Sequence, residues 1–192
     1  PEIGPFPTDR LTVSDTSQKT GLRVNLPLPD CVAQQSSCND LNQLNQLDGF
    51  SINARVQVRF SAPIDTATAV AGVFLVALDN LTQDEKGIHQ TGDVVRINQP
   101  VYDPATNTLY AKPDSVLDQH RHYALVVTDA VKDSGGAAVA ADPGFVGCSH
   151  ANGGDYCGAL AAALAAAAPK AAPSAIVGAS VFTTMSATAW ME

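Results

Sequence analysis

Short runs of β-branched and aliphatic residues recur along this chain at intervals of about ten residues, separated by Asp, Gly and Pro turns. Residues 55–60 alternate polar and apolar side chains, which is the period of a strand with one buried face. Residues 73–78 are continuously apolar, so we expect a central strand that is covered on both faces. The succession predicts a mainly β fold, an antiparallel β-sandwich. Further strands are expected at residues 22–26, 94–97, 123–128 and 177–184, with a hairpin-like return through 102–110.

One segment before the last predicted strand has the composition of a helix. Residues 156–168 are rich in alanine, the best helix former, with Asp155 as the expected N-cap and Pro169 as the expected C-terminal limit. Three larger side chains recur at steps of four and form an apolar stripe, which we treat as a candidate interface. We expect the stripe to cover an open edge or end of the sandwich, and the alanine flank to face a neighbouring domain. The alternative is a solvated helix whose alanines serve only helix propensity. The stripe consists of Tyr156, Leu160 and Leu164.

The four cysteines are spaced as two local pairs, Cys31 with Cys38 and Cys148 with Cys157. Neither pair has the two-residue gap of a zinc knuckle or a dithiol motif, so we expect disulfides that staple two loops. Four cysteines permit three connectivities, of which the local pairing is our prediction. Disulfide bonds indicate an oxidising compartment.

Length and charge narrow the possible functions. The 192 residues suit one large domain, which we place at 21–184, between an extended lead-in at 1–20 that crosses the surface and the start of a linker at 185–192. Eleven basic residues against nineteen acidic ones give a net charge of −8, and no Lys/Arg cluster interrupts that balance. Phosphate binding needs a basic face, so nucleic acid is not expected as a partner. No apolar run approaches the length of a membrane span.

Residue types that often carry chemistry do not form a catalytic constellation in this sequence. His120 and His122 would share one face of a strand, as two metal ligands do, but no third ligand is evident and we expect a surface or turn role. The segment around Ser180 is similar to the nucleophile elbow G-x-S-x-G, but Phe182 replaces the second glycine and we expect a structural serine. We therefore predict no catalytic residue, cofactor or metal.

Calcium binding is an alternative interpretation of two groups of acidic turn residues, because calcium needs several oxygens that converge from one compact loop. Neither group has the D-x-D-x-D-G spacing. Asx turns, in which the carboxylate caps nearby backbone N–H groups, are the expected role. The groups are Asp79, Asp84 and Glu85, and Asp129 with Asp133.

Several segments together resemble the N-terminal region of bacterial secreted or outer-membrane lipases and esterases of the virulence-factor lipase type. In that group an Ig-like domain precedes an α/β-hydrolase domain. Residues 6–13 (FPTDRLTV), 21–31 (GLRVNLPLPDC) and 47–50 (LDGF) carry this likeness. Residues 59–65, 73–76, 123–129 and 131–135 are similar to the bacterial Ig-like fold of surface-layer and hydrolase accessory domains, and 179–188 to the segment that precedes the hydrolase.

The resemblance implies an Ig-like antiparallel β-sandwich with the Ala-rich helix inserted before the last strand. It implies a non-catalytic accessory domain of an extracellular ester hydrolase, with the downstream α/β-hydrolase domain of the same protein as its partner. The serine nucleophile, acid and histidine would lie beyond the linker. A secreted, periplasmic or outer-membrane location is expected. The alternative is a stand-alone adhesion or stalk module of the cell surface that binds protein or glycan.

Overall fold

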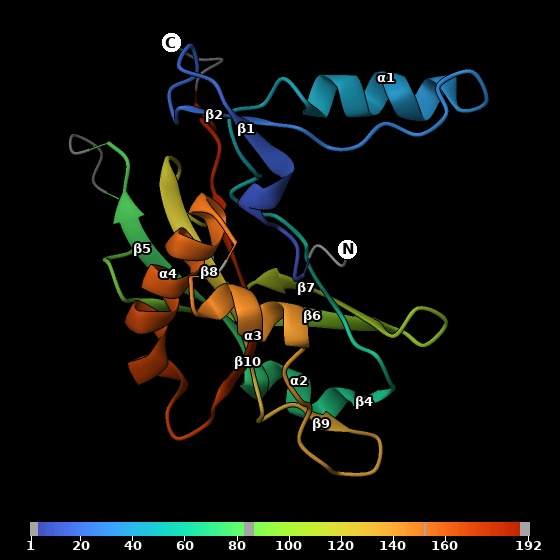
Figure 1. The fold of residues 1–192 in the computed structure, drawn as a ribbon, viewed down its shortest axis with the longest axis vertical. Helices are drawn as coiled ribbons and strands as arrows, with labels where there is room; N and C mark the ends of the chain where they lie inside the picture. The colour runs from blue at the N-terminus through green and yellow to red at the C-terminus, as the bar shows by residue number, and fades with distance from the viewer. Residues whose placement is uncertain (1–3, 83–86, 152, 189–192) are drawn as a thin grey trace.

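The computed structural model describes residues 4–82, 87–151 and 153–188. Its main element is a six-stranded antiparallel sheet with the strand order β10-β8-β5-β6-β7-β3 (Figure 1). All of the strands that the residue pattern predicts are present, and the mainly β prediction is confirmed. The strands of the main sheet are β3 (Val56–Arg59), β5 (Val73–Asn80), β6 (Val94–Asp103), β7 (Thr108–Pro113), β8 (Arg121–Thr128) and β10 (Ile176–Thr183).

Two small sheets and four α-helices lie around the main sheet. Strand β1 (Thr12–Ser14) pairs with β2 (Leu22–Val24), and β4 (Ile64–Asp65) pairs with β9 (Lys132–Asp133). Helix α1 (Gln35–Leu44) stands away from the main sheet beside β1 and β2 (Figure 1). Helices α2 (Thr66–Gly72) and α3 (Pro143–Ser149) were not predicted. Each has only seven residues, too few for a periodic pattern, but each begins at an aspartate that caps its first turn.

The Ala-rich helix α4 (Asp155–Ala171) lies between α3 and β10, before the last strand as predicted. Its predicted ends are wrong. Gly154 is the N-cap, so Asp155 is the first helical residue and places its carboxylate in the first turn, where the helix dipole favours it. Pro169 lies inside the helix, which continues because Ala167 and Ala171 are buried against the sheet on either side of it.

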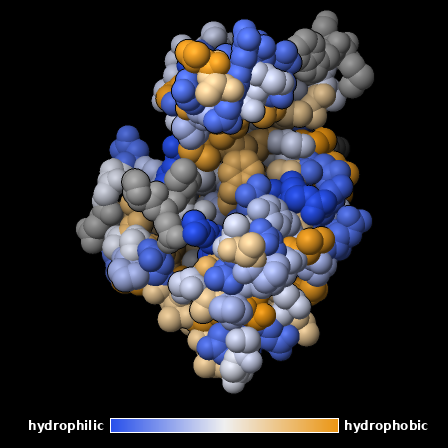
Figure 2. Space-filling view, turned by 90° about the vertical axis from the view of Figure 1, so that its right-hand side faces the viewer, coloured by the Kyte–Doolittle hydropathy of each residue, from blue (hydrophilic) through white to orange (hydrophobic). Residues whose placement is uncertain are grey.

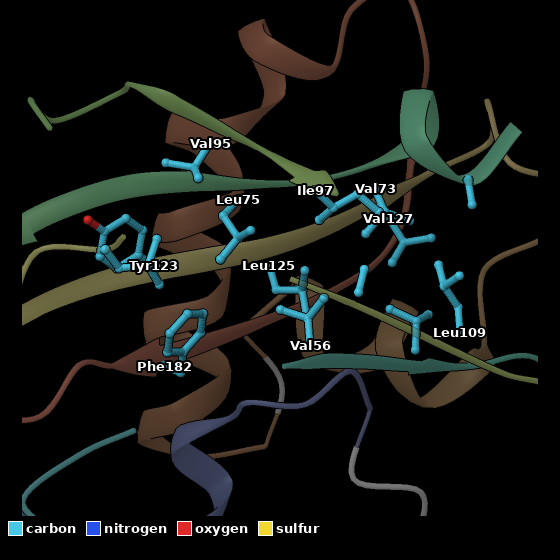
Figure 3. Close-up of a cluster of buried hydrophobic side chains, with 14 of the residues drawn as sticks. Val56, Val73, Leu75, Val95, Ile97, Leu109, Tyr123, Leu125, Val127 and Phe182 are labelled. Atoms are coloured by element: carbon cyan, nitrogen blue, oxygen red, sulfur yellow. The ribbon is translucent and has the colours of Figure 1, made fainter. Parts of the chain in front are cut away.

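Buried side chains form one cluster on each face of the sheet. Alternate residues of β5 divide between them: Val73 and Leu75 belong to the first cluster, and Phe74 and Val76 to the second. The prediction that this strand is central and covered on both faces is therefore confirmed. Figure 3 shows the first cluster, in which the rings of Tyr123 and Phe182 stack with centroids 5.9 Å apart.

The N-terminal segment closes the curled sheet between its two edge strands. Phe6 exchanges two backbone hydrogen bonds with Gln57 of β3, and the Pro7 carbonyl accepts a hydrogen bond of 2.7 Å from the Ser180 hydroxyl of β10. Thr8 is completely buried. The prediction that this segment crosses the surface is thus wrong for these residues, because the segment pairs with the free edge of β3 and its Asp9 carboxylate caps the backbone N–H of Thr183 on β10.

Candidate functional site

Helix α4 packs on the outer face of β5, β8 and β10, rather than on an edge or end of the sandwich as predicted (Figure 1). Leu160 is only 2% exposed and contributes to the second cluster with Phe74 and Val181. Tyr156 and Leu164 are partly buried against the same cluster. The predicted stripe is thus mainly internal packing. Only the opposite face of the helix is therefore accessible to a neighbouring domain.

Tyr156 also joins the helix to the N-terminal segment. Its hydroxyl accepts hydrogen bonds from the Thr8 hydroxyl at 2.9 Å and from the backbone N–H of Val181 at 3.3 Å. The Arg10 guanidinium lies over the Tyr156 ring, 4.6 Å from its centroid, and 3.0 Å from the Cys148 sulfur. These contacts explain why a tyrosine begins the stripe: its ring packs and its hydroxyl satisfies an edge N–H of β10.

The exposed side of α4 consists of small residues. Beside it, Val146 of α3 is 42% exposed, and an open depression of about 340 Å³ is lined by Phe145, Leu164 and Ile176 among others. This combination forms a weakly apolar surface, which we call the alanine face. Its exposed helix residues are Gly158, Ala159, Ala162, Ala165, Ala166 and Ala168.

Both disulfide bonds join the cysteines that were expected to pair. Cys31–Cys38 ties the loop before α1 to the first turns of that helix, and Cys148–Cys157 ties α3 to α4. The second bond is buried within the second cluster, whereas Cys31 is exposed. The bonds therefore hold two peripheral elements rather than the centre of the sheet.

The residues after β10 are held by side chains from two distant loops, which we call the C-terminal clamp. The Asp48 carboxylate accepts hydrogen bonds from the backbone N–H and the hydroxyl of Ser186. Nε2 of His120 lies 2.6 Å from the same hydroxyl, and Gln119 bonds both the backbone and the side chain of Thr188. His120 lies in a bend with φ of 52°, in keeping with the expected turn role, but its side chain is completely buried rather than at the surface.

A buried polar cluster that the sequence pattern did not indicate surrounds Asp118. Its carboxylate, 5% exposed, accepts hydrogen bonds from the backbone N–H groups of Ile88 and His89 at 2.6 and 2.9 Å. The Arg121 guanidinium lies 3.2 Å from the same carboxylate and also donates to the carbonyls of Leu78 and His89. The cluster ties the loop between β5 and β6 to the loop between β7 and β8.

Burial and hydrogen bonding shift the pKa of Asp118 in opposite directions. Burial raises the pKa of Asp118, but hydrogen bonds from His89 and Ile88 and the charges of His89 and Arg121 outweigh it, so the pKa is lowered overall. The Tyr123 hydroxyl accepts a hydrogen bond from the backbone N–H of Asp118, and burial raises the pKa of Tyr123 well above its usual value. The cluster thus holds an ionised carboxylate beside a neutral phenol.

One chain of contacts in this cluster has the order of a serine hydrolase triad. The Ser115 hydroxyl lies 3.1 Å from Nε2 of His89, whose Nδ1 lies 3.4 Å from Asp118. The same carboxylate oxygen also accepts from Arg121 and from the His89 backbone, so its charge is already balanced. We therefore assign the cluster a structural role. Sequence reasoning missed it because its members come from separate loops.

The other predicted residues have local partners. The Ser180 hydroxyl is buried and bonded to Pro7, as expected of a structural serine. His122 lies 3.0 Å from Asp79 through Nδ1, and Asp133 caps the N–H groups of Gly135 and Ala137 in an Asx turn.

Two of the acidic turn residues, Asp84 and Glu85, fall outside the described residues. Among the residues that are described, no group of three His, Cys, Asp or Glu side chains is close enough to hold a metal ion. No helix in the described part of the chain is long and apolar enough to cross a membrane.

A curled antiparallel sheet, closed at its edges and carrying disulfide-tied peripheral helices, defines an Ig-like β module. The family model described as bacterial Ig-like domain matches residues 41–146, more than half of the chain. The chain belongs to this bacterial Ig-like domain family. Its N-terminal closing segment, α4 and β10 lie outside the matched range. The family and the disulfides indicate an extracellular or cell-surface location.

Among solved structures, two parts of a bacterial surface-layer protein, SbsC, are similar to this chain. The structure of its domains 1–6 has 14% identity and a TM-score of 0.32, and the match covers 58% of this chain and 16% of that one. The structure of its N-terminal part has 13% identity and a TM-score of 0.32, with 58% of this chain and 27% of that one covered. The chain thus spans a minor part of each. No curated protein matches it.

Proposed function

We propose that this domain is a non-catalytic accessory module of an extracellular lipase or esterase, and that it packs against the α/β-hydrolase domain of the same protein. The observation that carries the proposal is the alanine face, where small exposed side chains lie beside the depression lined by Phe145 and Leu164. Small residues let a second backbone approach closely, and exposed apolar patches mark interaction sites. The resemblance of residues 6–13, 21–31 and 47–50 to secreted lipases supports the choice of partner.

The C-terminal clamp supports a positioning role. A segment bound through Asp48, His120 and Gln119 continues the domain rigidly up to Thr188. A neighbouring domain attached to a rigid segment keeps a fixed orientation, whereas a flexible Gly/Ser segment would leave it free. Secretion, with a periplasmic or outer-membrane location for the whole protein, belongs to this proposal.

The test has a catalytic and a genetic arm. The isolated domain should not turn over short-chain p-nitrophenyl esters. Hydrolysis that Ser180→Ala or Ser115→Ala abolishes would show that the domain is itself the enzyme. The coding sequence downstream should contain G-x-S-x-G within an α/β pattern.

The alternative function is a stand-alone adhesion or stalk module, and repeated Ig-like units downstream would favour it over the accessory role. One structural observation also favours it. The peripheral helices α3 and α4 cover the outer face of β5, β8 and β10 but leave the outer face of β6, β7 and β3 open.

A further inference from the structure

The outer face of the main sheet is covered over only half of its width. Helix α4 packs on β5, β8 and β10, and α3 packs on α4 and β10, but neither covers β6, β7 or β3. Alternation along the strands places Val56, Val58 and Leu109 in the core and directs their neighbours outward. The outward residues of these three strands form what we call the open face. They are Arg55, Gln57 and Arg59 beside and on β3, Tyr110 and Lys112 on β7, and Arg96, Asn98 and Val101 on β6.

The open face is basic in an acidic protein. Four of its residues are cations, whereas the whole chain has a net charge of −8. None of these four cations lies within ion-pair distance of a carboxylate in the described parts of the chain. Two acids border the face: Asp103, which ends β6 in the same row as Thr108 and Arg59 and whose carboxylate is bound to Ala105 and Thr106 in the hairpin turn, and Asp114, just beyond β7. The positive charge is therefore concentrated between these two borders.

The strand register arranges these side chains in rows. Gln57 is directly opposite Tyr110, and Asn98 is directly opposite Lys112. Because Val56 pairs with Ala111, Arg55 comes level with Lys112 on the next strand. Neighbouring strands are about 4.8 Å apart, so an extended ligand that lies across them meets a cation, an amide and an aromatic ring within a few ångströms.

We propose that the open face binds an acidic polysaccharide, a sugar polymer that carries carboxylate groups. Guanidinium groups bind carboxylates through paired hydrogen bonds, as Arg55 and Arg59 are placed to do. The amides of Gln57 and Asn98 both donate and accept, which suits sugar hydroxyls. The half-buried ring of Tyr110 offers a flat apolar surface with a polar edge for a sugar ring.

Two other classes of partner fit this face less well. A protein partner needs a desolvated apolar centre, and Val101, 56% exposed, is the one aliphatic side chain among the residues of the open face. A single-stranded nucleic acid needs a succession of aromatic platforms, whereas the open face has one ring, that of Tyr110. A pleated face with alternating cations and amides suits a hydrated polymer that is bound at its surface.

Electrophoresis of the whole domain through gels that contain polygalacturonate tests this proposal, with neutral dextran gels as the reference. The polymer should slow the domain, and the dissociation constant should follow from the dependence of mobility on polymer concentration. Arg55→Gln with Arg59→Gln should raise that constant about tenfold. Lys19→Gln with Lys170→Gln is the matched control, because it removes the same charge from exposed residues elsewhere and should leave the constant unchanged.

Tyr110→Ala separates sugar recognition from simple charge attraction. It should weaken polygalacturonate binding severalfold without changing the net charge, while the melting temperature shows that the variant is folded. The proposal is overturned if polygalacturonate does not slow the domain, if the two double variants lose affinity equally, or if single-stranded DNA binds more tightly without dependence on Tyr110. The proposal does not rest on the hydrolase assignment, so either can fail alone.

Discussion

The Ser186 hydroxyl oxygen lies 2.6 Å from Nε2 of His120, a residue 66 positions earlier in the chain. The same hydroxyl donates to Asp48, so one short side chain joins the end of the last strand to two separate loops. Such a contact fixes where the chain leaves the sandwich. It is therefore the contact whose loss would most directly affect the position of a neighbouring domain.

Ser186→Ala tests the C-terminal clamp. Removal of the hydroxyl leaves the Asp48 carboxylate with one hydrogen bond fewer, so the free energy of unfolding should fall by about 1 kcal/mol. Amide hydrogen exchange in residues 185–188 should accelerate, with exchange in β5 unchanged. Ser17→Ala, which alters an exposed serine on an Asx turn, is the control. Equal acceleration in both variants would show that the clamp does not hold this segment.

An introduced charge should destabilise the domain on the buried side of α4 but not on its exposed side. Leu160→Asp buries a carboxylate without a partner in the second cluster, so the free energy of unfolding should fall by about 2–4 kcal/mol. Leu164→Asp should cost less, because Leu164 is only partly buried. Ala162→Glu on the alanine face should leave the melting temperature of the isolated domain unchanged and weaken its association with a hydrolase domain.

A matched pair of alanines gives the control for α4. Ala163 is 4% exposed and adjoins Ala162 in sequence, so Ala163→Glu should destabilise the domain strongly. Thermal unfolding followed by circular dichroism distinguishes the two variants. Equal loss of melting temperature in both would mean that the alanine face is itself buried, and the proposed interface would be lost.

Peptide mapping without reduction should recover Cys31 linked to Cys38 and Cys148 linked to Cys157. A peptide that joins Cys31 to Cys148 would contradict this pairing. Replacement of Cys148 and Cys157 by serine should lower the free energy of unfolding by about 2–3 kcal/mol, since the bond closes a short loop between buried positions. Replacement of Cys31 and Cys38 should loosen α1 and leave the sheet unaffected, because α1 stands apart from it (Figure 1).

Tyr123 predicts a loss of stability in alkali. Its pKa is raised by burial in the folded state, so above pH of about 10 the unfolded chain loses its phenol proton while the folded chain keeps it. The free energy of unfolding should therefore fall as pH rises beyond that point, by up to about 1.4 kcal/mol per pH unit. Below that pH the phenol is protonated in both states, so Tyr123 causes no loss of stability there. Urea unfolding at about pH 9 and about pH 11 measures the difference.

Tyr123→Phe is the control for the alkaline loss. It removes the titrating phenol, and the remaining tyrosines are common to both proteins. The fall in stability between the two pH values should be smaller in the variant. An identical fall in both proteins would show that another group is responsible.

Some surface features could not be predicted from the sequence, because residues that are far apart in the chain form them. Figure 2 shows hydrophobic residues in the hollow beneath its upper lobe. An open groove of about 610 Å³ lies between β2 and α1, lined by Leu11, Leu26 and Leu28 among others. Leu11 and Leu28 lie outside the predicted strands, whereas Leu26 ends one of them, so only the folded chain brings the three together. The same holds for Ser115, His89 and Asp118, whose distances in sequence carry no motif.

The residue pattern alone determined the strands of the main sheet, the double burial of β5, the Ala-rich helix and the pairing of the cysteines, because each depends on side chains that are near in sequence. Only the tertiary structure decided that α4 covers a face rather than an edge, that Phe6–Thr8 closes the sheet, and that four scattered cations share one open face. Register and sheet curvature set those relationships. They arise from the packing of residues far apart in the chain, which local periodicity does not encode.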